Sequence, residues 1–87
     1  MSIGEEFEQA QVDVKELATR PGDDVLLQLY ALYKQGTQGD AGEKRPGVFD
    51  LVGRAKYDAW KALAGTAPAD AQQRYVALVR DLRTGTA

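Results

Sequence analysis

Two tyrosines and a lysine near the middle of the chain are the residues best suited to chemistry. Tyr30, Tyr33 and Lys34 close an apolar stretch, and Lys34 follows Tyr30 by four residues. Residues four apart on a helix are surface neighbours, so the phenol and the ammonium would lie side by side. Such a pair can hold a phosphate while the ring offers a flat apolar face. The same spacing is typical of ordinary residues at the edge of a core, and it favours neither interpretation.

Three further cations could belong to the same site. Arg54 and Lys56 fall near the start of an expected helix, where positive charge opposes the helix dipole. Either another interaction offsets this unfavourable placement, or the two cations serve only to keep the surface soluble. Lys15 follows the apolar Val14, so it either borders a buried face or is simply solvated.

The residues that are missing exclude most catalytic chemistry. The chain has no histidine and no cysteine, which removes the commonest general base, the usual nucleophile pairs and most zinc sites. The Asp23–Asp24 pair is interpreted as helix-start charge rather than a catalytic dyad. The glycine-rich stretch 36–47 lacks the Gly-Lys-Ser/Thr ending of a phosphate loop. We therefore expect no enzyme activity, no metal and no cofactor.

Length and charge limit the remaining classes. The chain of 87 residues predicts one domain over residues 1–87. A formal net charge of -2 argues against a nucleic-acid partner. No apolar run approaches the roughly 20 residues that span a bilayer, and the first residues do not form a secretory signal, so we expect no membrane insertion. The absence of cysteine fits a cytoplasmic location.

Apolar periodicity predicts four helices and no strand, and hence an all-α fold. The expected helices span residues 5–18, 22–37, 50–64 and 67–83. The second carries two apolar stripes, one through Val25, Leu29 and Leu32 and one through Leu26, Tyr30 and Tyr33. Trp60 and Tyr75 fall on buried faces of the third and fourth helices. Asp50 is the expected cap of the third helix. Thr66 or Ala67 is the expected cap of the fourth, and Thr66 is the better chemical candidate.

Four motifs together resemble the acyl-CoA-binding protein family. They are Tyr30-xx-Tyr33-Lys34-Gln35-x-Thr37-x-Gly39-Asp40, Arg45-Pro46-Gly47, Gly53-Arg54-Ala55-Lys56-Tyr57-Asp58-Ala59-Trp60 and Asp70-Ala71-xxx-Tyr75. Their order and spacing both agree with the family from about Phe7 to Leu82. The resemblance implies a four-helix up-down-down-up bundle with an open, bowl-shaped site.

The resemblance also implies non-catalytic binding, buffering and transport of medium- and long-chain acyl-CoA thioesters. In such proteins the acyl chain lies in an apolar groove and the 3′-phosphate of the CoA ribose meets tyrosine and lysine. By position, Tyr30, Lys34 and Lys56 match the phosphate-binding set. Tyr33 and Tyr75 match aromatic contacts to the nucleotide, Lys15 an auxiliary cation, and Leu26 and Leu27 groove positions near the acyl chain.

Four positions depart from the family pattern. Gln11 stands where a small alanine is common, and Tyr57 replaces a tryptophan. Val52 occupies a position often held by lysine, which removes one phosphate partner. Ala67 stands where a serine often caps the fourth helix, and Thr66 is expected to substitute for it.

One alternative function uses the same groove. The stripe ending in Tyr30 and Tyr33 could receive a partner helix, which would make the chain a helical protein-interaction module. An enzyme acting on the thioester is disfavoured by the lack of histidine and cysteine. No second exposed apolar face with a clear purpose is evident in the sequence, so we expect a monomer.

Overall fold

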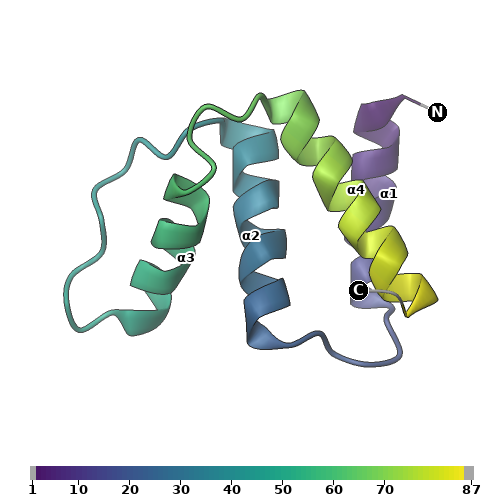
Figure 1. Ribbon diagram of the computed structural model, residues 1–87, viewed down its shortest axis with the longest axis horizontal. Coiled ribbons are helices and arrows are strands. Elements are labelled where there is room, and N and C mark those ends of the chain that lie inside the picture. The colour runs from purple at the N-terminus through teal and green to yellow at the C-terminus, as the bar shows by residue number, and fades with distance from the viewer. Residues whose placement is uncertain (1, 86–87) are drawn as a thin grey trace.

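Four helices make up most of residues 2–85, the part of the chain that the computed structural model describes. They are α1 (Ile3–Lys15), α2 (Asp23–Gln38), α3 (Leu51–Lys61) and α4 (Pro68–Thr84). No strand occurs within residues 2–85. α2 and α3 run in one direction, and α1 and α4 run in the opposite one (Figure 1). The predicted all-α class and the up-down-down-up order are confirmed.

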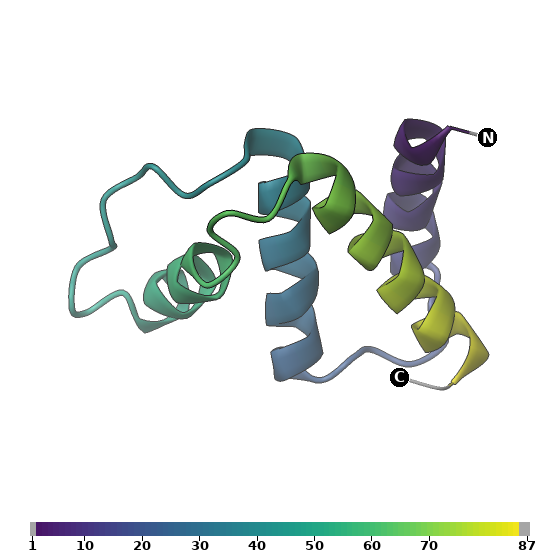
Figure 2. The ribbon, with the colours of Figure 1, turned by 45° about the horizontal axis from the view of Figure 1, so that its top comes forward.

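α2 is the central helix of the bundle. It packs against α4 on one side and α3 on the other, while α1 packs against α4 (Figures 1 and 2). The larger core fills the space between α1, α2 and α4, and its buried members are Phe7, Ala10, Leu29, Leu32, Ala71, Tyr75 and Val79. A smaller cluster of Ala31, Ala41 and Trp60 joins α2 to α3. One side of the molecule is therefore a packed bundle, and the other is a single helix held against it.

Close packing between α2 and α4 requires small residues at their contact. Ala71 of α4 is fully buried, and a methyl group added at Gly36 of α2 would come within 2.9 Å of the Gln72 side chain. The Gln72 amide Nε2 also donates to the Gly36 carbonyl at 2.8 Å. This contact fixes the end of α2 against the start of α4.

α1 begins earlier and ends earlier than the sequence predicted. Ser2 and Glu5 form a capping box, in which the Ser2 hydroxyl accepts from the Glu5 N–H at 3.2 Å and the Glu5 carboxylate accepts from the Ser2 N–H at 3.3 Å. The helix ends at Lys15, where the Glu16 N–H turns back to the Asp13 carbonyl. Leu17 is half-buried in the connection that follows rather than in the helix.

α3 also ends sooner than expected, at Lys61 instead of residue 64. The chain continues in tight turns with three-residue hydrogen bonds, from Leu63 N–H to the Trp60 carbonyl and from Ala64 N–H to the Lys61 carbonyl. Such turns keep side chains three residues apart on one side, so the apolar period persists past the helix. The predicted cap is confirmed at the other end, because the Asp50 carboxylate accepts from the Gly53 N–H at 2.9 Å.

Of the two predicted caps of α4, Ala67 is the one observed, and the preference for Thr66 was wrong. The N-cap residue is Ala67, which offers no side-chain hydrogen bond. Thr66 lies one residue too early, and its carbonyl accepts from the Gln35 amide instead. The first turn of α4 therefore relies on Pro68 and on the acidic Asp70. None of the described helices is both long and apolar enough to cross a lipid bilayer.

The uncapped start of α4 generates a stability prediction. The Ala67 backbone is already extended, with φ -61° and ψ 141°, so an Ala67→Ser hydroxyl could reach the free N–H groups of the first turn. We expect Ala67→Ser to raise the free energy of unfolding by about 1 kcal/mol, measured by urea denaturation. Ala69→Ser, placed inside the helix, is the control and should not stabilise the protein. Equal stability of Ala67→Ser and the parent chain would contradict this account.

Candidate functional site

The predicted residues of α2 emerge on a face that the larger core does not cover. Leu29 and Leu32 point into that core and are buried, so the residues next to them turn outward. Tyr30 and Lys34 are half-buried, and Tyr33 is 39% exposed. A helix advances by about 100° per residue, which places Tyr30, Tyr33 and Lys34 on one continuous surface. The structure therefore brings these three predicted residues together.

Each cation of the site lies over an aromatic ring on the neighbouring helix. The Lys56 ammonium of α3 is 5.3 Å from the centre of the Tyr30 ring, and the Lys34 ammonium of α2 is 4.9 Å from the Trp60 ring. The sequence had paired Lys34 with Tyr30, but the structure exchanges the partners across the α2–α3 interface. Cation–π contacts of this kind orient a lysine without neutralising its charge. Both ammonium groups thus remain able to bind an anion.

Three aromatic rings continue the surface from α2 towards α1 and α4. The Phe7 ring is 6.1 Å from Tyr33 and meets Tyr75 edge-on at 5.1 Å. Tyr75 is only 5% exposed, and this burial, with a smaller contribution from Tyr33, raises the pKa of its phenol. The structure therefore leaves Tyr33 as the accessible ring of the group, with Phe7 and Tyr75 packed behind it. The Gln11 amide, at a position that departs from the family pattern, donates to the Phe7 carbonyl at 3.3 Å.

Lys15 stands apart from the other predicted residues. It is the exposed last residue of α1, and its side chain makes no hydrogen bond, ion pair or ring contact with another of the described residues. Its predicted role as an auxiliary cation stays a prediction.

Two cavities flank the Tyr30–Lys56 pair. The larger, of about 340 Å³, is lined by Leu26 and Leu27 together with Arg20, Asp23, Tyr30, Val52, Ala55 and Lys56. The smaller, of about 140 Å³, is lined by Tyr30, Glu43, Pro46, Gly53, Lys56, Tyr57 and Trp60. Tyr30 and Lys56 line both and separate an apolar compartment near the start of α2 from a more polar one near its middle. We call the larger cavity the apolar groove.

A pair of hydrogen bonds holds the connection between α2 and α3 beside the smaller cavity. Arg45 donates to Asp58 from Nε at 3.0 Å and from Nη2 at 2.8 Å. These bonds hold the pKa of Asp58 below its ordinary value and raise the pKa of Arg45. Arg54 adds a bond from Nε to the Pro46 carbonyl at 3.1 Å. No role was predicted for Arg45 or Asp58, because their interaction joins a loop residue and a helix residue 13 positions apart.

The end of α3 and the turn after it are tied to the end of α2 through the buried Gln35 side chain and the polar groups around it. The Gln35 side chain is fully buried, and its Nε2 donates at 2.8 Å to both the Asp40 carboxylate and the Thr66 carbonyl. Asp40 also accepts from the Gly65 N–H at 3.0 Å. The hydrogen bond from Gln35, then that from Gly65, lower the pKa of Asp40. The Trp60 indole completes the set by donating to the Gly39 carbonyl at 2.8 Å.

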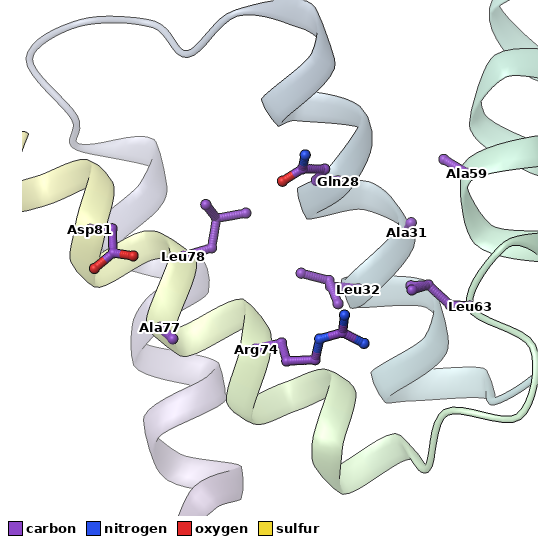
Figure 3. Close-up of a pocket in the computed structure, with 9 residues that line it drawn as sticks. All are labelled: Gln28, Ala31, Leu32, Ala59, Leu63, Arg74, Ala77, Leu78 and Asp81. Atoms are coloured by element: carbon purple, nitrogen blue, oxygen red, sulfur yellow. The ribbon is translucent and has the colours of Figure 1, made fainter. Parts of the chain in front are cut away.

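A separate and larger cavity, of about 570 Å³, lies on a different face of α2 (Figure 3). Its lining comes from α2, α4, α3 and the turn after α3, and consists of Gln28, Ala31, Leu32, Ala59, Leu63, Arg74, Ala77, Leu78 and Asp81. None of the predicted ligand residues contributes to it, and it contains no tyrosine and no lysine. We therefore place the candidate site at the Tyr30–Lys56 pair rather than in the larger cavity. Residues 2–85 contain no cluster of acidic side chains, histidines or cysteines able to hold a metal ion.

The fold and this surface define a small helical binding protein with an aromatic and cationic site beside an apolar groove. Residues 4–79 match the family model described as "Acyl CoA binding protein". The chain is 54% identical over 76 residues to acyl-CoA-binding protein homolog 1 of Caenorhabditis elegans, a match that covers 87% of this chain and 88% of the relative. It superposes on the crystal structure of Oryza sativa acyl-CoA-binding protein 2 with a TM-score of 0.92 and 38% identity, covering 97% and 93% of the two chains.

The chain therefore belongs to the acyl-CoA-binding protein family. It is also 48% identical over 82 residues to rat enoyl-CoA delta isomerase 2, but the matched region is only 21% of that longer enzyme. This chain therefore resembles only one part of the isomerase.

The Asp40 interactions generate a pH prediction. Because the folded pKa of Asp40 lies below the ordinary value of 3.8, its contribution to stability is present above that value and is lost as the pH falls through the folded pKa. We expect Asp40→Asn to lose less stability than the parent chain between pH 5 and pH 3, measured as the urea midpoint at each pH. Glu8→Gln, which alters an exposed carboxylate of α1 with no hydrogen-bond partner among the described residues, should behave like the parent. The same loss in all three proteins would contradict the role given to Asp40.

Proposed function

We propose that this protein binds medium- and long-chain acyl-CoA thioesters reversibly, and that residues 1–87 act as one monomeric domain that buffers and carries them in the cytoplasm. Membership of the acyl-CoA-binding protein family supports the ligand class. The observation that carries the proposal is the arrangement along α2, where an apolar groove leads into an aromatic and cationic surface.

The site has two chemically different ends. Leu26, Tyr30 and Tyr33 recur at helical spacing, so they share one face of α2, and about 10 Å of helix axis separates the first from the last. Leu26 and Leu27 line the apolar groove, whereas Tyr33 presents its ring next to Lys34. A ligand lying along this face would need an alkyl chain at one end and an aromatic, anionic group at the other. An acyl-CoA has this composition.

We assign the 3′-phosphate of the CoA to Tyr30, Lys34 and Lys56. The ring contacts hold both ammonium groups beside the Tyr30 and Trp60 rings, so little reorganisation is needed when the phosphate arrives. Tyr33 is assigned to stack with the adenine, and Tyr75 acts through Phe7 to support the Tyr33 ring. Lys15 supplies an auxiliary positive charge from the end of α1.

Magnitudes indicate that both ends are needed. Burying a sixteen-carbon chain is worth on the order of 10 kcal/mol at about 0.8 kcal/mol per CH₂, before several kcal/mol are lost in ordering the ligand. Stacking one base adds about 1 to 3 kcal/mol, and a charge-assisted hydrogen bond to phosphate adds about 1.5 to 3 kcal/mol. Acyl-CoA should thus bind tightly, CoA less tightly and a free fatty acid weakly.

We further propose that the protein binds and releases the thioester without reacting with it. The chain contains neither histidine nor cysteine, so it lacks the commonest general base and the usual thiol nucleophile. The isomerase activity of the longer relative is not carried over, because the shared region is about a fifth of that enzyme. The alternative of a helical protein-interaction module receives no support from the comparisons.

Lys56→Ala tests the phosphate end. The substitution should weaken CoA and palmitoyl-CoA by a similar factor, about 10- to 100-fold, because a hydrogen bond to a charged group is worth about 1.5 to 3 kcal/mol. It should have little effect on 3′-dephospho-CoA, which lacks the group that Lys56 is proposed to hold. Calorimetric titration measures all three. Lys61→Ala, which removes the same charge from the end of α3, is the control. Equal weakening of CoA and dephospho-CoA would move the phosphate away from Lys56.

Ala55→Phe tests the apolar groove. Ala55 lines this cavity, so a phenyl ring there should occupy space proposed for the alkyl chain. Displacing about three methylenes should weaken palmitoyl-CoA by about 2 kcal/mol, or about 30-fold, and leave CoA unchanged. Ala62→Phe, on the exposed residue after α3, is the matched control. Unchanged affinity of Ala55→Phe for palmitoyl-CoA would place the chain elsewhere.

A further inference from the structure

The cavity of about 570 Å³ on the other face of α2 has no part in the proposed acyl-CoA site (Figure 3). Small-molecule pockets in proteins usually measure about 300–1,000 Å³, so this cavity is large enough for a ligand of its own. It shares no lining residue with the apolar groove or with the smaller cavity beside Tyr30. We call it the basin.

The floor and walls of the basin are apolar. Its apolar lining residues are Ala31 and Leu32 of α2, Ala59 of α3, Leu63 in the turn after α3, and Ala77 and Leu78 of α4. Three of these six are alanines, and their small side chains leave the space open. The two α2 residues are buried, whereas the two α4 residues and Leu63 remain partly exposed. An apolar body in the basin would therefore remove more of this surface from water.

The dimensions of the basin indicate the shape of its ligand. Its lining spans about 6 Å along α2, from Gln28 to Leu32, and about 10 Å along α4, from Arg74 to Asp81. Its volume over this length gives a mean cross-section on the order of 50 Å². A linear alkyl chain would leave part of that width empty and its lining without contacts. A partner helix of several turns would extend beyond it, so the basin fits a compact ring system.

Arg74 gives the basin a cation with no acidic partner within residues 2–85. The ion pairs formed among these residues all use other arginines. Figure 3 shows the Arg74 side chain reaching from α4 towards Leu32 and Leu63, across the apolar floor. A guanidinium presents a planar fork of donors that matches a carboxylate. The Gln28 amide, on the α2 side of the lining, offers a further donor.

Asp81 limits the charge that a ligand can carry. It lines the basin two turns after Arg74 on the same helix, so a cation and an anion lie about 10 Å apart along α4. A second negative group at the far end of a ligand would face the Asp81 carboxylate, and like charges repel each other. The basin therefore favours a molecule with a single anionic group.

We propose that the basin is a second binding site, which takes a ring-bearing monocarboxylate whose rings lie on the apolar floor and whose carboxylate pairs with Arg74. This site does not depend on the acyl-CoA function, because the two surfaces lie on different faces of α2 and share no lining residue. Each ligand should bind whether or not the other is present.

Amide chemical shifts of the nitrogen-15-labelled protein, titrated with 2-naphthoate, test the site. Saturable shifts should appear at residues that line the basin. Arg74→Ala should weaken this binding by about tenfold or more, because the charge-assisted pair with the carboxylate is lost. Arg80→Ala removes an exposed arginine of the same helix that does not line the basin, and this matched control should bind like the parent. The absence of saturable shifts at the basin, or equal binding by Arg74→Ala, would overturn the proposal.

Saturating palmitoyl-CoA separates the second site from the first. It should leave the affinity for 2-naphthoate unchanged, and displacement of 2-naphthoate would place both ligands in one site and overturn the proposal. Ala77→Phe, at an exposed position of α4, should block 2-naphthoate because its ring occupies the basin. The urea midpoint of this variant shows that it is folded, and unchanged binding by the folded variant would contradict the location.

Two related compounds test the shape and the charge of the site. Undecanoate has the same number of carbons as 2-naphthoate in a linear chain and should shift the basin amides only at higher concentration. 2,6-Naphthalenedicarboxylate should bind several-fold more weakly than 2-naphthoate, and Asp81→Asn should reduce this difference. Equal affinity of the parent chain for 2-naphthoate and either compound would contradict the proposed ligand class.

Discussion

The buried amide of Gln35 is the contact on which the open half of this fold depends. Within residues 2–85, α3 packs against no helix other than α2, so the contacts between these two helices and their connections hold it in place. Both hydrogen-bond partners of Gln35 Nε2 are acceptors, Asp40 just after α2 and the Thr66 carbonyl after α3, which settles the orientation of the amide. Trp60 adds the bond to the Gly39 carbonyl. These polar contacts hold the end of α3 and the turn after it against the end of α2, and Lys56 of the same helix lies over the Tyr30 ring.

The larger core and the proposed binding site lie on different sides of α2. On one side, Leu29 and Leu32 join the buried core shared with α1 and α4. On the other, Tyr30 and Lys34 meet a single helix over the small cluster around Trp60, and space remains on both sides of the Tyr30–Lys56 pair. Tyr33 lies at the border, where Phe7 supports its ring from the core side while part of it stays exposed.

Local sequence patterns predicted that the four helices exist, but they were less successful for the residues at which the helices end and for the side-chain contacts between helices. The apolar period and the Asp50 cap identified α3, but the period continued through turns that are not α-helical, and it could not distinguish the two. The Ser-x-x-Glu pattern at Ser2 could have placed the start of α1 correctly. The exchange of partners between Lys34 and Lys56 could not be predicted from helical spacing, because it depends on how α2 and α3 face each other. The exposure of Phe49 could not be predicted from the sequence either, because an apolar run before a helix is more often buried.

The two-ended site is tested most directly by calorimetric titration of this protein with palmitoyl-CoA, CoA and palmitate in parallel. The account predicts tight one-to-one binding of palmitoyl-CoA, weaker binding of CoA and little binding of palmitate, because the cations beside Tyr30 and the apolar groove each supply part of the affinity. Palmitate binding as tight as palmitoyl-CoA would contradict the phosphate end of the site. The absence of binding by all three would contradict the proposed function.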